Sequence, residues 1–68
     1  MEKSVSNRLK EVRHDWRMNQ TEFALAIGLS ATQYNRYEKG TSVPSLEVAL
    51  KISEKVGRTV NNLFYLAP

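Results

Sequence analysis

The residues QTEFALAIGLSATQYNRYEKG, positions 20–40, decide the fold of this chain. They fit two short helices that are joined by a tight turn at Gly28. The second helix places small polar side chains on one face and apolar side chains on the other. No charged residue occurs between Phe23 and Asn35, although 25% of the chain is charged. An uncharged polar surface with basic flanks suits the edges of bases, which lie between phosphates. The stretch therefore predicts a DNA-binding surface.

Capping signals set the start of the first of these helices. Asn19 and Glu22 are three residues apart and resemble a capping box, in which each side chain bonds the backbone N–H of the other residue. This pattern predicts a helix over residues 20–27. Gly28 ends it, because glycine readily adopts the left-handed conformation that follows many helices.

The next helix is expected over residues 31–39. Ser30 is its N-cap, and Gln33 is placed to complete a second capping box with Ser30. Tyr34 and Tyr37 are three residues apart and point inward, which favours packing in the core over stacking on bases.

Apolar residues upstream recur at helical spacing and predict a first helix over residues 5–16. They are Val5, Leu9, Val12 and Trp16. Ser4 is a reasonable N-cap for this helix. The helix should end near Arg17, in a position where glycine would adopt the left-handed C-cap more easily. Arg17 is therefore expected to introduce some strain.

Two further helices follow a loop at residues 41–44, where Pro44 prevents the preceding helix from continuing. One is predicted over residues 46–56, after the N-cap Ser45, and the other over residues 60–65. The apolar stripe of the longer helix is Leu46, Ala49, Leu50, Ile52 and Val56. Without a strand signal, the expected fold is all-α. It is a single domain over residues 1–68, built as a compact bundle of five short helices.

Composition excludes several classes of site. The chain contains ten Lys and Arg and seven Asp and Glu, so its net charge is +3. This charge permits nucleic-acid binding without requiring it. There is no cysteine and only one histidine, so we expect no disulfide, no metal site and no cofactor. Met1 to Ser6 is too polar for a signal peptide, and no apolar run approaches the ~20 residues of a membrane span. These features predict a cytoplasmic protein with no membrane partner and no evident small-molecule ligand.

Together these motifs resemble the phage-repressor and Cro-type (Xre-like) helix-turn-helix family. The resemblance extends from about residue 7 to residue 64. Its pieces, in order, are NRLKEVR, NQTEFALAIGLSATQYNRYEKG, VPSLEVALKISEKVG and TVNNLF. The chain departs from the family pattern at Arg17, where glycine is usual, and at Arg58, where a small apolar residue is usual. Thr32 replaces a frequent glutamine, which changes the bases that are read rather than whether DNA is bound.

The resemblance implies that the third helix enters the major groove while the second lies across the DNA backbone. The residues implied to face bases are Ala31, Thr32, Gln33 and Arg36. The residues implied to bind phosphates are Asn19, Gln20, Ser30, Asn35, Lys39, Thr41 and Ser42. Gln33 can pair with adenine and Arg36 with guanine, and the methyl groups of Ala31 and Thr32 can contact thymine. The competing roles are helix capping for Gln33 and a solvated surface position for Arg36.

The resemblance also implies an ion pair between Arg13 and Glu38. This pair would neutralise a carboxylate close to DNA and fix the angle of the third helix. The family commonly pairs through its C-terminal end. We therefore expect Phe64, Tyr65 and Leu66 to form the interface of a homodimer that reads half-sites ~34 Å apart. A monomer with a frayed tail is the alternative.

The function expected from these features is sequence-specific, non-enzymatic regulation of transcription through a partly palindromic operator in double-stranded DNA, most simply as a repressor. Glu22 and Glu38 could be imagined as catalytic carboxylates, but no nucleophile or phosphate-binding loop accompanies them. The alternative, from another class, is a protein-interaction module of the same fold. It would be an antitoxin-like or anti-repressor partner whose surface at Thr32 and Gln33 no longer reads bases.

Overall fold

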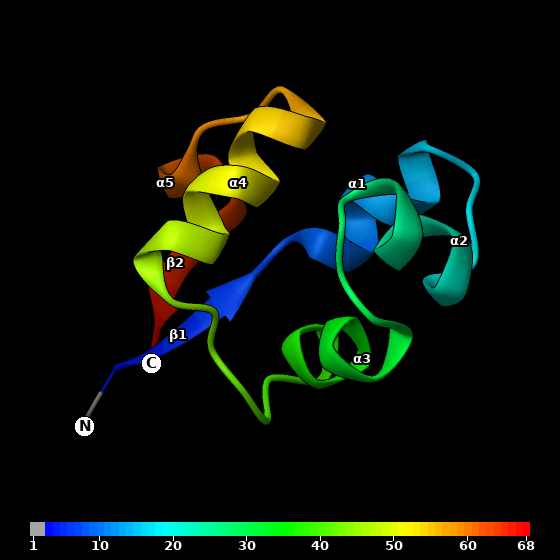
Figure 1. Cartoon of the computed structure of the whole chain (residues 1–68). Coiled ribbons are helices and arrows are strands. Elements are labelled where there is room, and N and C mark those ends of the chain that lie inside the picture. The colour runs from blue at the N-terminus through cyan, green and yellow to red at the C-terminus, as the bar shows by residue number, and fades with distance from the viewer. Residues whose placement is uncertain (1–2) are drawn as a thin grey trace.

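The computed structural model describes residues 3–68, so Met1 and Glu2 of the predicted domain lie outside the described residues. The elements follow in the order β1 (Ser4–Asn7), α1 (Leu9–Asp15), α2 (Gln20–Ala26), α3 (Ala31–Lys39), α4 (Leu46–Val56), α5 (Val60–Leu63) and β2 (Phe64–Ala67). Figure 1 shows α1, α2 and α3 on one side of the molecule and α4, α5 and the strands on the other. Within residues 3–68, each helix is too short or too polar to cross a membrane.

The helix pair indicated by the sequence is present. Both halves of the predicted capping box form: Asn19 Oδ1 accepts from the Glu22 N–H at 2.8 Å, and Glu22 Oε1 accepts from the Asn19 N–H at 3.0 Å. Gly28 lies between the helices with φ at +81°, a conformation that glycine adopts without Cβ strain. The start of α2 and the turn after it are therefore set by local interactions.

The prediction of an all-α fold is wrong at both ends of the chain. The helix predicted over residues 5–16 begins only at Leu9, and the helix predicted over residues 60–65 ends at Leu63. The residues outside these helices form β1 and β2, which pair antiparallel. Over residues 3–68, the fold is a helical domain of five helices with a short two-stranded sheet.

Asn7 explains why α1 does not start near Ser4. Its backbone belongs to β1, where it is in register with Phe64 of β2. Its side-chain Oδ1 accepts from the Leu9 N–H at 3.1 Å, and its Nδ2 donates to the Tyr37 carbonyl oxygen at 2.8 Å. These contacts place the change from strand to helix at residues 7–9. Val5 is at helical spacing from Leu9, but its β-branched side chain also suits a strand, and Val5 pairs with Leu66 of β2.

The core receives side chains from every helix. Its buried members are Leu9, Val12, Phe23, Ala24, Ile27, Tyr34, Tyr37, Ile52 and Leu63. The ring of Phe23 meets Trp16 edge-on at 5.2 Å and Tyr34 at 5.4 Å between ring centroids. Such edge-to-face pairs add to the stabilisation that burial provides. The interpretation of both α3 tyrosines as core residues is confirmed.

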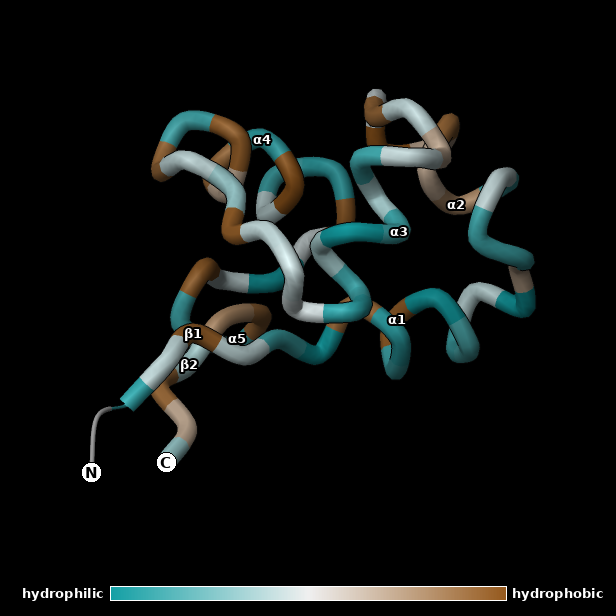
Figure 2. Tube along the Cα trace, turned by 90° about the horizontal axis from the view of Figure 1, so that it is seen from below, coloured by the Kyte–Doolittle hydropathy of each residue, from teal (hydrophilic) through white to brown (hydrophobic). Residues whose placement is uncertain are grey.

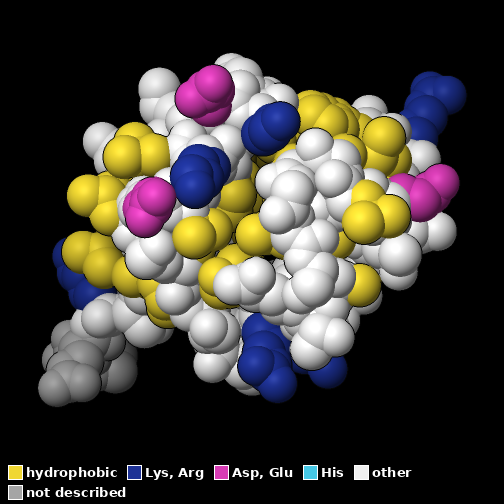
Figure 3. Space-filling model, in the orientation of Figure 1, with side chains coloured by type: hydrophobic (Ala, Val, Ile, Leu, Met, Phe, Trp, Pro, Cys, Tyr) yellow, Lys and Arg dark blue, Asp and Glu magenta, His cyan; other side chains and the backbone are white. Residues whose placement is uncertain are grey.

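The apolar stripe predicted for α4 is only partly buried. Ala49 and Ile52 face the core, but Leu46 is 71% exposed and Leu50 is 54% exposed. Val43, in the loop before α4, is 55% exposed. Hydrophobic and hydrophilic residues alternate along α4 (Figure 2), and hydrophobic side chains lie on the surface over this helix (Figure 3). We call Val43, Leu46 and Leu50 the α4 apolar patch.

Arg17 adopts the left-handed conformation, with φ at +55°. Replacing Arg17 with glycine is expected to raise the free energy of unfolding by about 0.5–1 kcal/mol. The reason is that relief of Cβ strain outweighs the larger backbone entropy of glycine in the unfolded chain. Urea unfolding followed by circular dichroism measures the change. The control is Lys55→Gly in α4, which should lower stability because glycine is a poor helix former. A loss of stability in both variants would refute the strain at Arg17.

Candidate nucleic-acid interface

An open groove of about 490 Å³ lies between α2 and α3. It is lined by Gln20, Thr21, Ala31, Thr32, Asn35, Arg36, Lys39 and Thr41. All of these except Thr21 were predicted from the sequence to contact DNA. Arg36 and Lys39 are basic, and no acidic residue is among the described residues that line the groove. The groove therefore combines hydrogen-bonding groups with positive charge, as a nucleic-acid surface requires.

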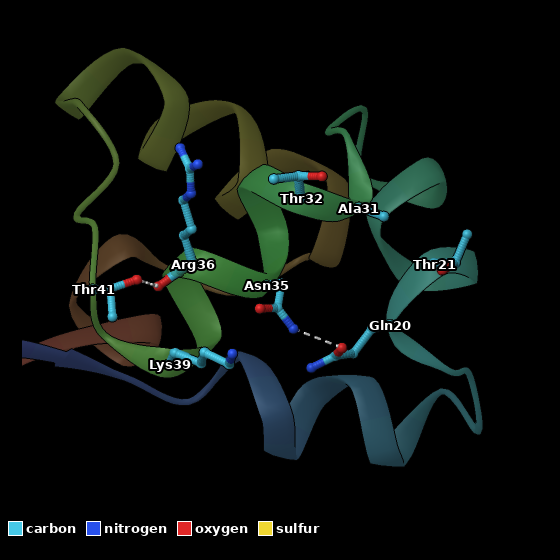
Figure 4. Close-up of a pocket in the computed structure, with 8 residues that line it drawn as sticks. All are labelled: Gln20, Thr21, Ala31, Thr32, Asn35, Arg36, Lys39 and Thr41. Atoms are coloured by element: carbon cyan, nitrogen blue, oxygen red, sulfur yellow. Dashed lines mark hydrogen bonds between the residues drawn. The ribbon is translucent and has the colours of Figure 1, made fainter.

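The α3 residues predicted to face bases are all exposed. These residues are Ala31, Thr32, Gln33 and Arg36. Figure 4 shows Thr32 and Arg36 projecting from the same side of α3, away from the body of the helix. Three of the four line the groove, and Gln33 does not. This face of α3 is thus open to a ligand rather than packed inside the protein.

Gln33 does not complete the capping box predicted for α3. The Ser30 hydroxyl oxygen accepts from the Gln33 backbone N–H at 3.1 Å, so Ser30 is the N-cap. The Gln33 side chain instead donates from Nε2 to the Tyr37 hydroxyl oxygen at 2.7 Å. Residues four apart are neighbours on a helix surface, and this places the Tyr37 hydroxyl within reach of the Gln33 amide.

Arg13 and Glu38 form a two-point ion pair between α1 and α3. Arg13 Nε lies 3.0 Å from Glu38 Oε2, and Arg13 Nη2 lies 3.1 Å from Glu38 Oε1. The side chains are only 12% and 8% exposed. Arg13 Nη1 also donates to the carbonyl oxygen of Met18 at 3.1 Å, just before α2. One guanidinium group therefore links α1, α3 and the segment that leads into α2.

A chain of hydrogen bonds continues from this pair into the groove. Gln20 Nε2 donates to Glu38 Oε1 at 3.1 Å, and Asn35 Nδ2 donates to Gln20 Oε1 at 2.9 Å. Figure 4 shows Gln20 and Asn35 pointing toward one another across the gap between α2 and α3. Both ends of the Gln20 amide are engaged within the protein. The side chain predicted to bind phosphate thus also fixes how α2 lies against α3.

The surroundings of Glu38 keep it ionised. Burial by itself would raise the pKa of Glu38. Hydrogen bonds from Arg13 and Gln20, with the nearby Tyr34 hydroxyl, outweigh this effect and lower the pKa below its ordinary value. The hydrogen bond to Glu38 raises the pKa of Arg13 in turn. Because the two charges neutralise each other, the positive charge of Arg36 and Lys39 dominates the groove.

The remaining residues predicted to bind phosphate lie outside the groove lining. They are Asn19, Ser30 and Ser42. Asn19 and Ser30 use their side-chain oxygens as helix caps. Sequence reasoning missed Thr21, for which no local signal exists. It also missed the contact of the Tyr37 hydroxyl, although the spacing of Gln33 and Tyr37 could have indicated it.

The residues predicted to form a dimer interface lie on β2 rather than on a helix. Phe64 packs partly against the core, whereas Tyr65 is 38% exposed and Leu66 is 63% exposed. The guanidinium carbon of Arg8 lies 4.3 Å from the centroid of the Tyr65 ring, a cation–π contact. Leu66 is therefore the most exposed apolar side chain of the three.

Comparison with known proteins shows which family this chain resembles. The family described as helix-turn-helix matches residues 9–63. A Pyrococcus horikoshii protein named for an HTH-type transcriptional regulatory role is 47% identical over 47 residues, which are 69% of this chain and 15% of that protein. The Vibrio cholerae protein named as the cryptic phage CTXphi transcriptional repressor RstR is 34% identical over 58 residues, which are 85% of this chain and 52% of RstR.

A solved structure shares the fold. The crystal structure of a Bacteroides fragilis protein named for DNA binding has a TM-score of 0.75 and 24% identity, and the match covers 91% of this chain and 100% of that chain. The curated relatives are longer, since this chain spans about half of RstR and a smaller part of the archaeal protein. The family match itself covers most of the chain. This chain belongs to the helix-turn-helix family.

Proposed function

We propose that this protein regulates transcription by binding a specific sequence in double-stranded DNA, with α3 in the major groove. The observation that carries this proposal is the open groove between α2 and α3, which is lined by polar and basic side chains. An α-helix fits the major groove of DNA, where each base pair presents a distinct pattern of donors and acceptors. The protein acts by binding rather than by catalysis.

The proposed contacts divide into two groups. Ala31, Thr32, Gln33 and Arg36 contact base edges, because they are exposed along one helix. Lys39 and Thr41, at the end of α3 and just after it, bind phosphate together with Gln20 and Asn35. The capping residues Asn19 and Ser30, with Ser42, belong to the proposed phosphate-binding group as well, although they do not line the groove. Base contacts give specificity, and phosphate contacts fix the position of the protein on the duplex.

Repression through a partly palindromic operator is the form of regulation that we propose. RstR is named as a phage transcriptional repressor, and its likeness to this chain supports this choice. One short helix reads too few base pairs to distinguish a site from ~10⁶ or more competing sites. A two-fold dimer would read two half-sites about one turn of DNA apart.

Exposed apolar side chains support the dimer. Tyr65 and Leu66 on β2, and the α4 apolar patch, remain exposed within a single chain. Apolar surface of this kind on a small protein is commonly covered by a partner. Burial against a second copy would also add to the core of a domain that is too small to be very stable alone.

Replacement of Arg36 with alanine is expected to weaken binding to the preferred site by about 1–3 kcal/mol and to relax the preference at a single base pair. The reason is that a forked guanidinium contact to guanine would be lost. Enrichment of random duplexes on the wild-type protein defines the site, and titrations with each single-base variant of that site measure the preference.

Lys39→Ala is the control for charge alone. Loss of a phosphate contact should weaken all sequences alike and reduce the salt dependence of binding. An equal, sequence-independent loss in both variants would contradict the assignment of Arg36 to a base. No enrichment of any sequence by the wild-type protein at physiological salt would overturn the proposed function. That result would favour a protein-interaction module, which the α4 apolar patch would also suit.

A further inference from the structure

Tyr37 connects the core to the base-facing side of α3. The residue is only 4% exposed, and it belongs to the core cluster. Its carbonyl oxygen accepts a hydrogen bond from Asn7 Nδ2 at 2.8 Å, which ties it to β1. Its hydroxyl nevertheless lies 2.7 Å from Nε2 of the exposed Gln33. A rigidly held hydroxyl therefore contacts a flexible side chain that faces solvent.

The bond to Tyr37 occupies only part of the Gln33 amide. A glutamine amide has two N–H donors and a carbonyl oxygen that accepts. Tyr37 uses one N–H, and within residues 3–68 no hydrogen bond occupies the other N–H or Oε1. Adenine in the major groove needs one donor to N7 and one acceptor for N6–H. The groups that remain on Gln33 are the ones that adenine requires.

We infer that Tyr37 is a positioning residue that holds the Gln33 amide in its adenine-reading orientation before DNA binds. This inference rests on the proposed function. Ordering a flexible side chain at an interface weakens binding. A hydrogen bond that already exists in the free protein removes part of that loss, and it also restrains the amide from turning over. Tyr37 thereby contributes to specificity without touching DNA.

Tyr34 supplies a matched control in the same helix. Its ring is buried like that of Tyr37. Within residues 3–68, however, the Tyr34 hydroxyl has no hydrogen-bond partner of good geometry. Tyr34→Phe and Tyr37→Phe thus each remove one hydroxyl from the core face of α3, and only Tyr37→Phe releases Gln33.

The test measures binding of five proteins to the duplex selected by the wild-type protein and to single-base variants of it. The proteins are the wild type, Tyr37→Phe, Gln33→Ala, the double variant of these two, and the control Tyr34→Phe. Tyr37→Phe is expected to bind the selected duplex about three- to tenfold more weakly and to lose preference at the base pair read by Gln33. Binding to unrelated DNA should not change. In the Gln33→Ala background, Tyr37→Phe should have no further effect, because the two residues act through one contact.

Thermal unfolding of each variant separates positioning from folding. A general loss of stability would weaken binding to every sequence alike, whereas positioning affects one base pair. The inference is overturned if Tyr37→Phe keeps its base preference, if it binds more tightly, or if its effect persists without Gln33. It is also overturned if Tyr34→Phe shifts the preference at the same base pair. If the wild-type protein itself has no sequence preference, the proposed function fails and this inference fails with it.

Discussion

Replacing Glu38 with alanine is expected to lower the free energy of unfolding by about 3–5 kcal/mol, because the Arg13 guanidinium is left buried without its partner. Arg13 is 12% exposed, so water compensates for little of the lost interaction. Gln20 loses a hydrogen-bond acceptor at the same time. The core of a domain of this size rarely supplies more than about 3–5 kcal/mol of stability. The expected loss is therefore comparable to the whole free energy of unfolding. Urea unfolding at neutral pH, followed by circular dichroism, measures the effect.

Glu47→Ala is the matched control, because Glu47 also pairs with a basic residue. Its partner is Lys51, at 3.4 Å, and both side chains are more than two-thirds exposed. An exposed pair of this kind contributes about 0.3–0.5 kcal/mol. Similar losses in the two variants would show that burial does not strengthen the Arg13–Glu38 contact. A double change of Arg13 to methionine and Glu38 to leucine should recover much of the stability, since it leaves no unpaired charge.

The same pair gives stability a defined dependence on pH. The pKa of Glu38 is lower in the folded protein than its ordinary value, so folding favours the ionised carboxylate. Its contribution is fully present above the pKa of the unfolded carboxyl group, about 4.3. It is lost as the pH falls through the lower pKa of the folded state. The wild-type protein should therefore lose stability below about pH 4 more steeply than Glu38→Gln. Equal slopes would contradict the assigned direction of the shift.

Replacing Leu66 with glutamate is expected to reduce affinity for the full operator by about 100-fold or more, if two chains bind together through β2. A dimer turns the second half-site contact into an intramolecular event, and this effect alone gives factors of about 10²–10⁴. Leu66 is 63% exposed, so the fold should survive the change. Sedimentation equilibrium measures the state of association. Titrations with one and with two half-sites measure affinity.

Leu25→Glu controls for the added negative charge. Leu25 lies on α2 and is 72% exposed, so the chemical change is the same while the position differs. Only Leu66→Glu should produce a monomer that keeps its affinity for a single half-site. The dimer assignment would be wrong if Leu66→Glu kept full affinity for the operator. It would also be wrong if both variants lost affinity equally.

Much of the central helix pair could be predicted from sequence, because its signals are local. The side chain of Asn19 bonds a backbone group only three residues away, and Ser30 does the same for α3. Gly28 adopts the left-handed turn from its own conformational preference. The exposed face of α3 followed from helical spacing. Each of these features involves residues within one or two turns, so no knowledge of distant segments was needed.

The side-chain partners within the site could not be predicted in the same way. Gln20 is bonded to both Asn35 and Glu38, which lie on another helix. Gln33 bonds Tyr37 instead of completing a cap. A glutamine can satisfy its amide in several directions, and the sequence does not tell which partner lies closest.

The sequence by itself determined where α2 and α3 begin, how they turn and which side chains of α3 face outward, because capping and helical periodicity act between near neighbours. Only the tertiary structure decided that Ser4–Asn7 is a strand, since its hydrogen-bonding partner is Phe64–Ala67 at the other end of the chain. It also decided that Ile52 is buried while Leu46 and Leu50 are exposed. In so small a domain the core covers only one side of α4, and the packing of the other elements selects that side.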